Sequence, residues 1–340
     1  MKFSNPKVSV IVPCRNEEKS IKSLLEALWG QTYPTQDMEV VIADGMSTDG
    51  TRKIISEFKD HYRELDVHIV DNEKLNIPSG INRAITASGG EFIVRIDAHS
   101  IPHSNYVEKC VDLLEAGRGS VIGGTWVPTP GSPSWLGKSI VQAISHPLGV
   151  GDALHRYSRK AGFVDTVSFG AFHRSLLNKV GLFNEGLLTN EDYEFNARVR
   201  ASGGKIWFDP KIKFQYIAKS KLRDLAKQYI RYGFWKGVML KSNPGTIRWR
   251  QALPPLFVLS IIVGLMLGLV WGWFYIPLVI MLSIYFSVLL GAGLLTAAKE
   301  SDLGFLIGLP IAITTMHFCW GGALLWSLIS KSKIPTAPAS

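Results

Sequence analysis

Cysteine is scarce in this chain of 340 residues, which has only Cys14, Cys110 and Cys319. These three lie far apart and form no CxxC pair, which argues against a disulfide framework and against a structural zinc site. The chain also has no apolar segment before the first expected strand, so we expect no signal peptide. Together these absences predict that the first part of the chain folds in the cytosol.

Charge is nearly missing from residues 253–329, whereas residues 205–250 carry twelve lysines and arginines against two aspartates. A basic stretch beside long apolar runs is typical of positive-inside topology and of attraction to anionic lipid. One or two of these cations could instead bind a diphosphate. The aromatic residues here follow helical spacing without a recognition motif, which argues against a nucleic-acid partner.

Short apolar runs alternate with helical periodicity along the first two thirds of the chain. This alternation predicts an α/β fold with a doubly wound, mostly parallel sheet. We expect strands at residues 8–13, 39–43, 67–70, 91–96, 121–125, 166–172 and 205–208. We expect helices at residues 18–28, 51–58, 79–87, 105–114, 134–145, 174–180, 191–201 and 221–240.

The domain organisation follows from these patterns. We expect a cytosolic domain at residues 1–220, an amphipathic interfacial helix region at 221–250 and transmembrane helices at 251–330. The apolar runs 253–273, 275–297 and 305–329 could each cross a hydrocarbon core about 30 Å thick.

Three spans would leave the catalytic part inside the cell and the C-terminus outside. Lys331 and Lys333 argue against the last crossing. A two-span hairpin with a re-entrant or peripheral third segment is therefore the alternative topology.

Ligands of doubly wound sheets bind at the carboxyl ends of the strands, and the first two motifs lie there. In VPCRNE, Pro13 and Arg15 could form one wall of a nucleotide pocket that Glu17 orients. In VIADGMSTDGT, the carboxylate of Asp44 could accept the imide N–H of a uracil, and Asp49 could cap the next helix. Asp and Gly after a strand are also ordinary turn residues, so only the combination of the motifs is specific.

The third motif, RIDAHS, predicts a metal site for a nucleotide diphosphate. Asp97 follows a buried strand, and His99 would point to the same side in an extended segment. A carboxylate and an imidazole suit Mn²⁺ as well as Mg²⁺, and either ion would neutralise a leaving diphosphate. A lone histidine after a strand is more often a turn residue; the Asp-x-His pairing favours the metal site.

The fourth motif, TNEDYEFN, provides a general base. An acceptor hydroxyl must lose its proton as it attacks a sugar, and a partly buried carboxylate can take it. Asp192 is the expected base, with Glu191 shaping the acceptor site. Acids in a first helical turn are also common caps, so this motif alone does not decide.

The fifth motif, QYIRYGFWK, places Gln228, Arg231, Tyr232 and Trp235 on one helix face. Arg231 could bind a diphosphate through two hydrogen bonds, and Trp235 could stack on a sugar. The competing interpretation is an interfacial helix with aromatic anchors. The glycine-rich residues 146–158 could form a mobile lid or an acceptor loop.

All five motifs occur in the order found in glycosyltransferase family 2, which the chain resembles over about residues 7–235. The strings DGMSTDGT, RIDAH, VDTVSFGAF and NEDYEFN resemble the succinoglycan-type exopolysaccharide glucosyltransferases. The resemblance implies the GT-A fold and an inverting transfer of a hexose from a UDP-sugar to a polyprenyl-diphosphate-linked saccharide. By the same resemblance, Asp44 matches the uracil-binding Asp, Asp97 the first Asp of the DxD motif, Asp192 the base and Arg231 the Arg of QxxRW.

Two departures from the family pattern matter. His99 stands where the second Asp of DxD is usual, and Tyr232 stands where QxxRW has Trp. The first leaves the metal open between Mn²⁺ and Mg²⁺, and the second argues against a channel-forming synthase. The remaining alternatives are a processive polysaccharide synthase, a polyprenyl-phosphate hexosyltransferase and a non-catalytic nucleotide-binding membrane subunit.

Overall fold

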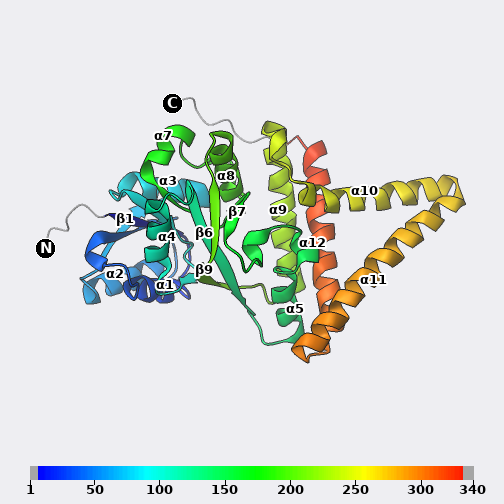
Figure 1. Cartoon of the computed structure of the whole chain (residues 1–340), viewed down its shortest axis with the longest axis horizontal. Coiled ribbons are helices and arrows are strands. Elements are labelled where there is room, and N and C mark those ends of the chain that lie inside the picture. Colours follow the sequence, from blue (N-terminus) through cyan, green and yellow to red (C-terminus); the bar gives the residue numbers. More distant parts are fainter. Residues whose placement is uncertain (1–6, 332–340) are drawn as a thin grey trace. The chain divides into compact units, whose positions relative to one another are not determined.

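The structure is a computed structural model that describes residues 7–331, and the chain divides into two compact units (Figure 1). The first unit comprises residues 7–127 and Ser158–Tyr216. The second comprises Pro128–Tyr157 and the helices that follow residue 217. Residues 1–6 and Lys333 lie outside the described residues. Pro128–Tyr157 thus groups with the C-terminal helices, although it lies within the first 220 residues of the sequence.

The first unit is built on one mixed sheet. Its parallel part runs in the order β3 (Asp66–Asp71), β2 (Met38–Asp44), β1 (Val8–Cys14) and β4 (Phe92–Arg95). The sheet continues through β8 (Ala171–His173), β6 (Val121–Thr129), β9 (Ile206–Ile217) and β5 (Ser100–Pro102), and β7 (Gly162–Val164) pairs with β9. The pairs β4–β8, β6–β8, β5–β9 and β7–β9 are antiparallel. The expected parallel half is present, with an antiparallel half added to it.

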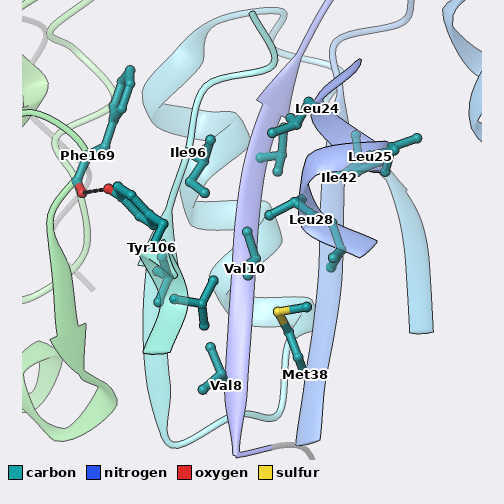
Figure 2. Close-up of a cluster of buried hydrophobic side chains, with 14 of the residues drawn as sticks. Val8, Val10, Leu24, Leu25, Leu28, Met38, Ile42, Ile96, Tyr106 and Phe169 are labelled. Carbon is teal, nitrogen blue, oxygen red and sulfur yellow. Dashed lines mark hydrogen bonds between the residues drawn. The ribbon is translucent and has the colours of Figure 1, made fainter. Parts of the chain in front are cut away.

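Helices cover both faces of the sheet, which explains why β1 and β2 are buried along their whole length. Successive strand residues point to opposite faces, so Val10 and Ile11 enter different cores. The first core is shown in Figure 2, where Leu28 lies beside Val10 and Leu24 lies beside a point further along the same strand. On this face pack α1 (Ile21–Trp29), α2 (Thr51–His61) and α4 (Tyr106–Glu115); on the other pack α3 (Ile77–Ala87) and α8 (Glu191–Ala201).

Several expected elements need correction. The strand predicted at residues 166–172 is wrong except for its end, because residues 165–170 are irregular and β8 begins at Ala171. The strand predicted at 205–208 continues as β9 to Ile217, and β5 was not expected. The helix at 174–180 is present as η3 (Arg174–Leu176) and α7 (Leu177–Val180), and a short η1 (Thr35–Asp37) precedes β2. The cysteines are free, and Cys14 and Cys110 are buried.

The second unit is helical. It contains α5 (Trp135–Ala143), α6 (Pro147–Val150), η2 (Leu154–Arg156), α9 (Leu222–Ser242), η4 (Pro244–Thr246), α10 (Trp249–Val270), η5 (Gly272–Phe274), α11 (Tyr275–Glu300) and α12 (Gly304–Ile329). Helices α9 and α12 lie side by side (Figure 1). Three helical segments in the described part of the chain, Trp249–Val270, Gly272–Glu300 and Gly304–Ile329, are long and apolar enough to cross a membrane.

Candidate functional site

The parallel strands of the first unit end at one level, so that the first two motifs, VPCRNE and VIADGMSTDGT, lie next to each other. Cys14 of β1 lies opposite Asp44 of β2, which in turn lies opposite Asp71 of β3. The loop after β1 packs on the loop after β2: Ser47 Oγ accepts from the backbone N–H of Asn16 at 2.8 Å. Because these loops hold each other, the residues predicted to surround a nucleotide lie on one rim of the sheet.

Asp44 is fully buried and already has partners. Ser47 donates to it from its backbone N–H at 3.0 Å, and Arg52 Nε donates to its Oδ2 at 2.5 Å. Arg52 also donates to Asp71, so the guanidinium joins the ends of β2 and β3. A base that binds at Asp44 would therefore exchange partners with Ser47 or Arg52. The uracil role of Asp44 stays a prediction.

The loop after Asp44 begins with a glycine, because the side chain of Arg15 lies directly against this position. A Cβ placed on Gly45 would lie 3.2 Å from Arg15 Cβ, so the arginine stem packs directly over the glycine. Asp49 Oδ1 accepts from the backbone N–H of Thr51 at 3.1 Å, but Gly50 occupies the N-cap position of α2, so Asp49 holds the residue that begins the helix without being its cap.

Glu17 and His99 form a contact that links the pocket motif with the metal motif. His99 Nδ1 lies 3.2 Å from Glu17 Oε1, and Ser20 Oγ donates to Glu17 Oε2. Burial raises the pKa of Glu17, but the hydrogen bonds from His99 and Ser20 outweigh it and leave the pKa below its usual value. Glu17 is therefore ionised at neutral pH and available to orient the imidazole.

The segment around Asp97 is not extended as the sequence suggested. The backbone N–H of Ser100 donates to the Asp97 carbonyl at 3.0 Å, which closes a turn over Ala98 and His99. The alternation argument that placed Asp97 and His99 on the same side is therefore wrong. Both still lie at the carboxyl end of β4, and their role in metal binding stays a prediction.

Arg95, the last residue of β4, lies at the centre of the candidate site. Its side chain is 2% exposed, and it donates to Asp97 Oδ1 at 3.0 Å, to Glu191 Oε1 at 2.8 Å and to Asp192 Oδ1. Burial alone would lower the pKa of Arg95, but the three carboxylates raise it well above its ordinary value. One guanidinium thus brings the predicted metal ligand and both acids of the fourth motif together.

Sequence reasoning missed Arg95, although a signal was present. A charged residue inside the apolar run FIVRID should be buried, and a buried charge needs partners of opposite sign. The arginine also lies over the ring of Phe169, with its Cζ 5.6 Å from the ring centroid. Phe169 has a φ of 54°, a left-handed conformation unfavourable for an aromatic residue, within the string VSFGAF.

Asp192 is a largely buried acid whose pKa is raised, and its role as general base stays a prediction. It lies in the first turn of α8, and its side chain is 23% exposed. Burial is the main cause that raises the pKa of Asp192 to about 7; Arg95 opposes this shift, whereas Glu191 and Asp97 add to it. A carboxylate with a pKa near the working pH both accepts and releases protons readily.

The fifth motif lies in the second unit. Gln228, Arg231, Tyr232 and Trp235 are all in α9, and Gln228 Nε2 donates to the Tyr232 hydroxyl at 2.8 Å. Residues 146–158 also belong to the second unit, where the His146 side chain accepts from the N–H of Leu148 at 3.1 Å. The donor-binding roles of Arg231 and Trp235 and the lid role of residues 146–158 stay predictions.

Comparison with known proteins now identifies the family. Residues 9–181 match the family described as Glycosyl transferase family 2. The chain is 30% identical over 324 residues to the succinoglycan biosynthesis protein ExoA of Rhizobium meliloti (strain 1021), covering 94% of each chain. The chain belongs to glycosyl transferase family 2.

Two further similarities extend this result. A Methanococcus voltae protein is 29% identical over 272 residues, 76% of this chain and 83% of its own; its name is dolichyl N-acetyl-alpha-D-glucosaminyl phosphate 3-beta-D-2,3-diacetamido-2,3-dideoxy-beta-D-glucuronosyltransferase. Mannosyltransferase PcManGT from Pyrobaculum calidifontis, solved with GDP-Man and Mn²⁺, superimposes with a TM-score of 0.61 at 17% identity and covers 97% of this chain and 89% of its own. The GT-A fold, family 2 and the succinoglycan-type likeness predicted from the sequence are confirmed.

Proposed function

We propose that this family 2 glycosyltransferase transfers a hexose from a UDP-sugar to a polyprenyl-diphosphate-linked saccharide with inversion, in exopolysaccharide or cell-surface glycan synthesis. The observation that carries the proposal is the meeting of Asp97, Glu191 and Asp192 at Arg95. This cluster combines Asp97, an acid that could bind a cation and diphosphate, with Asp192, a carboxylate suited to accept a proton. The names of the Rhizobium and Methanococcus relatives support a glycan-building role with a lipid-linked substrate.

The reaction needs one displacement. Asp192 accepts the proton of the acceptor hydroxyl as its oxygen attacks C1 of the donor sugar. The bond from C1 to the donor diphosphate breaks on the opposite face, and the electron pair leaves with UDP. Arg95 keeps Asp192 and Glu191 in place while the charge moves. Inversion follows because a single carboxylate acts as base and none is assigned as nucleophile.

The donor diphosphate would be held with a divalent cation, Mn²⁺ or Mg²⁺, which neutralises the charge of the leaving group. Asp97 and His99 are the residues that would hold the cation. Within residues 7–331 no group of three or more acidic, histidine or cysteine side chains could hold a metal. This fits a cation completed by phosphate oxygens and water, as is common for Mg²⁺ at phosphate sites.

The apolar helices support a placement at the cell membrane as a multi-pass protein. The first unit would lie on the cytosolic face, where a nucleotide sugar is available and a lipid-linked acceptor exposes its headgroup. Arg231 and Trp235 of α9 would contribute to donor binding.

The test is turnover of a panel of UDP- and GDP-sugars by the detergent-solubilised protein with a lipid-linked saccharide acceptor. We expect a UDP-hexose to be used and one sugar to be added with inverted anomeric configuration, which NMR of the product reveals. A preference for a GDP-sugar would refute the uracil role of Asp44. Retention of configuration would refute the single displacement, and a ladder of long products would indicate a processive synthase.

A further inference from the structure

We propose that α10 and α11 alone cross the bilayer, as a two-span hairpin, and that α12 remains at the cytosolic surface beside α9. This topology rests on the membrane placement proposed above, but not on the reaction or the donor. The lipid bilayer is the partner of the hairpin, and water or headgroups surround the α9–α12 pair. The C-terminal end of α12 then lies on the same side as the start of α10.

The hairpin has the surface of a lipid-facing element. Only 11% of the residues in the apolar stretch of Trp249–Val270 and 17% of those in Gly272–Glu300 are buried within the protein. Exposed side chains along it are large and apolar, such as Met266 and Leu269, with Leu269 82% exposed. The 22 residues of α10 extend about 33 Å, which takes the helix from its first turns at α12 across most of a hydrocarbon core of about 30 Å. The tip, η5, carries Trp273 and Phe274, which suit a membrane interface.

Helix α12 has a different environment, since 44% of the residues in its apolar stretch are buried. Its C-terminal half packs along α9 through small residues. A Cβ on Gly233 would lie 2.3 Å from the Trp320 carbonyl oxygen, and a Cβ on Gly237 would lie 2.7 Å from Ser327 Cβ. Backbones this close can be separated only by breaking the pair, so α12 cannot enter the bilayer here without α9.

Helix α9 is unsuited to the bilayer core. Lys236 is 1% exposed and its Nζ donates to the Thr246 carbonyl at 2.9 Å, whereas Arg231 and Lys241 are exposed. Lys241 Nζ donates to the Ser330 carbonyl, so both helices end at the same level. A fully inserted α12 would carry these cations into hydrocarbon, where charged side chains are costly.

The contact between the start of α10 and α12 indicates where α12 lies relative to the membrane surface. A Cβ on Gly321, in the C-terminal half of α12, would lie 2.5 Å from the Pro254 carbonyl oxygen. Pro255 has no N–H to donate to the carbonyl of Gln251, and Trp320 Nε1 of α12 approaches that carbonyl at 3.4 Å. The first turns of α10 therefore cross the C-terminal half of α12, next to the charged residue Arg250. If Arg250 marks the cytosolic surface, this part of α12 lies at that surface too.

The other end of α12 is also polar. Lys138 of α5 pairs with Asp302 at 2.9 Å, in the turn that joins α11 to α12. Gly304 packs against α5, where a Cβ would lie 2.7 Å from Trp135 Cβ. Both ends of α12 are thus tied to other helices of the second unit, and α10 and α11 diverge toward α12 from their shared tip (Figure 1).

Labelling of one introduced cysteine at a time tests this topology in sealed membrane vesicles of known orientation. The variants are Lys299→Cys at the base of α11, Gly272→Cys at the hairpin tip and Lys331→Cys after α12. A Cβ at Gly272 meets no atom within 4 Å and Lys331 is exposed, so these substitutions should preserve the fold. A membrane-impermeant maleimide is the probe, and the unmodified chain gives the background of the native cysteines.

We expect Lys299→Cys and Lys331→Cys to react from the cytosolic side and Gly272→Cys to react only from the opposite side. Reaction of Lys331→Cys from the same side as Gly272→Cys would show three spans and overturn the proposal. A tip that reacts from neither side or from the cytosolic side would show that the hairpin does not cross. Glycosyl transfer measured in the same vesicles separates these outcomes from a failure of the proposed reaction.

Discussion

Arg95 lies at the end of β4 with its guanidinium enclosed by Asp97, Glu191 and Asp192. A charge taken out of water this completely is stable only while its partners remain. The three acids depend on Arg95 in turn, because each would be left buried beside like charges if the arginine were removed. The stability of the first unit and the geometry of the candidate site therefore depend on the same residue.

Replacing Arg95 by Met should cost about 3–5 kcal/mol of folding stability, because it leaves three carboxylates without their cation. The measurement is thermal or chemical unfolding of the detergent-solubilised protein. Lys53→Met is the control, since Lys53 forms an exposed pair with Glu57 in which both side chains are more than half exposed. Equal melting temperatures for the Arg95 variant and the wild type would show that the cluster does not stabilise the fold.

Asp192→Asn should slow turnover on the order of 10²–10⁴-fold, since the amide cannot take the proton of the acceptor. The affinity for UDP, measured by calorimetry, should stay within a few-fold of wild type. A parallel loss of UDP affinity would instead assign Asp192 to structure or to donor binding.

Asp97→Asn should behave differently, with donor binding and turnover lost together. The amide keeps the size of the side chain but removes the charge that attracts a divalent cation. Titrating Mn²⁺ against the wild type and this variant, with UDP binding as readout, checks the prediction. Wild-type enzyme that keeps full activity after exhaustive treatment with a chelator would contradict the metal site.

At the scale of elements, local periodicity predicted most of the first unit. The helix expected at 191–201 has those bounds as α8, because acids in the first turn mark its start. The strand at 166–172 failed because β-propensity does not reveal that Val167 and Phe169 serve as core contacts in an irregular segment. The short β5 was missed because its three residues carry no pattern and depend on pairing with distant β9.

For the motif residues too, the sequence predicted positions along the chain but not contacts made by side chains. Order along a parallel sheet correctly placed Asp44 and Asp97 at strand ends. It could not reveal Arg52 beside Asp44 or Arg95 between the acids, because those contacts depend on side-chain directions across separate elements. Motif reading found the acids but not the cations that hold them.

The close contact between α9 and α12 can be tested with a matched pair of glycine variants. Gly233→Ala should destabilise the second unit by about 1–3 kcal/mol, because the methyl group would overlap the Trp320 backbone. Gly322→Ala, on α12, should be neutral or stabilising, because a Cβ there meets no atom within 4 Å and Ala favours a helix. Melting temperatures in detergent compare the two, and equal effects would contradict the close approach.

At the scale of the whole molecule, the predicted site residues and the apolar helices fall into two compact units whose boundaries differ from the consecutive regions predicted from the sequence. The first unit contains Arg95 and the acids, and the second contains the fifth motif and the apolar helices. Linear boundaries could not predict that Pro128–Tyr157 would group with the C-terminal helices, because its packing partner α12 is distant in sequence.

The basic residues of the second unit should make turnover depend on lipid charge. A variant with Lys221→Gln, Arg223→Gln and Lys227→Gln removes three exposed cations near the start of α9. We expect wild-type turnover in nanodiscs to rise with the fraction of anionic lipid and this response to shrink in the variant, since each cation contributes about 1 kcal/mol near such a surface. The control, Lys53→Gln with Lys59→Gln on α2, should respond like wild type; an unchanged response of the α9 variant would exclude this attraction.

The charge balance around Arg95 also has a kinetic consequence. Three carboxylates around one guanidinium leave negative charge in excess when all are ionised. A nucleotide sugar that arrives alone is repelled, whereas one that arrives with a bound cation, or after it, meets a site of reduced negative charge. By reciprocity, donor and cation raise each other's affinity by the same factor. The apparent Michaelis constant for the donor is therefore expected to fall as the cation concentration rises.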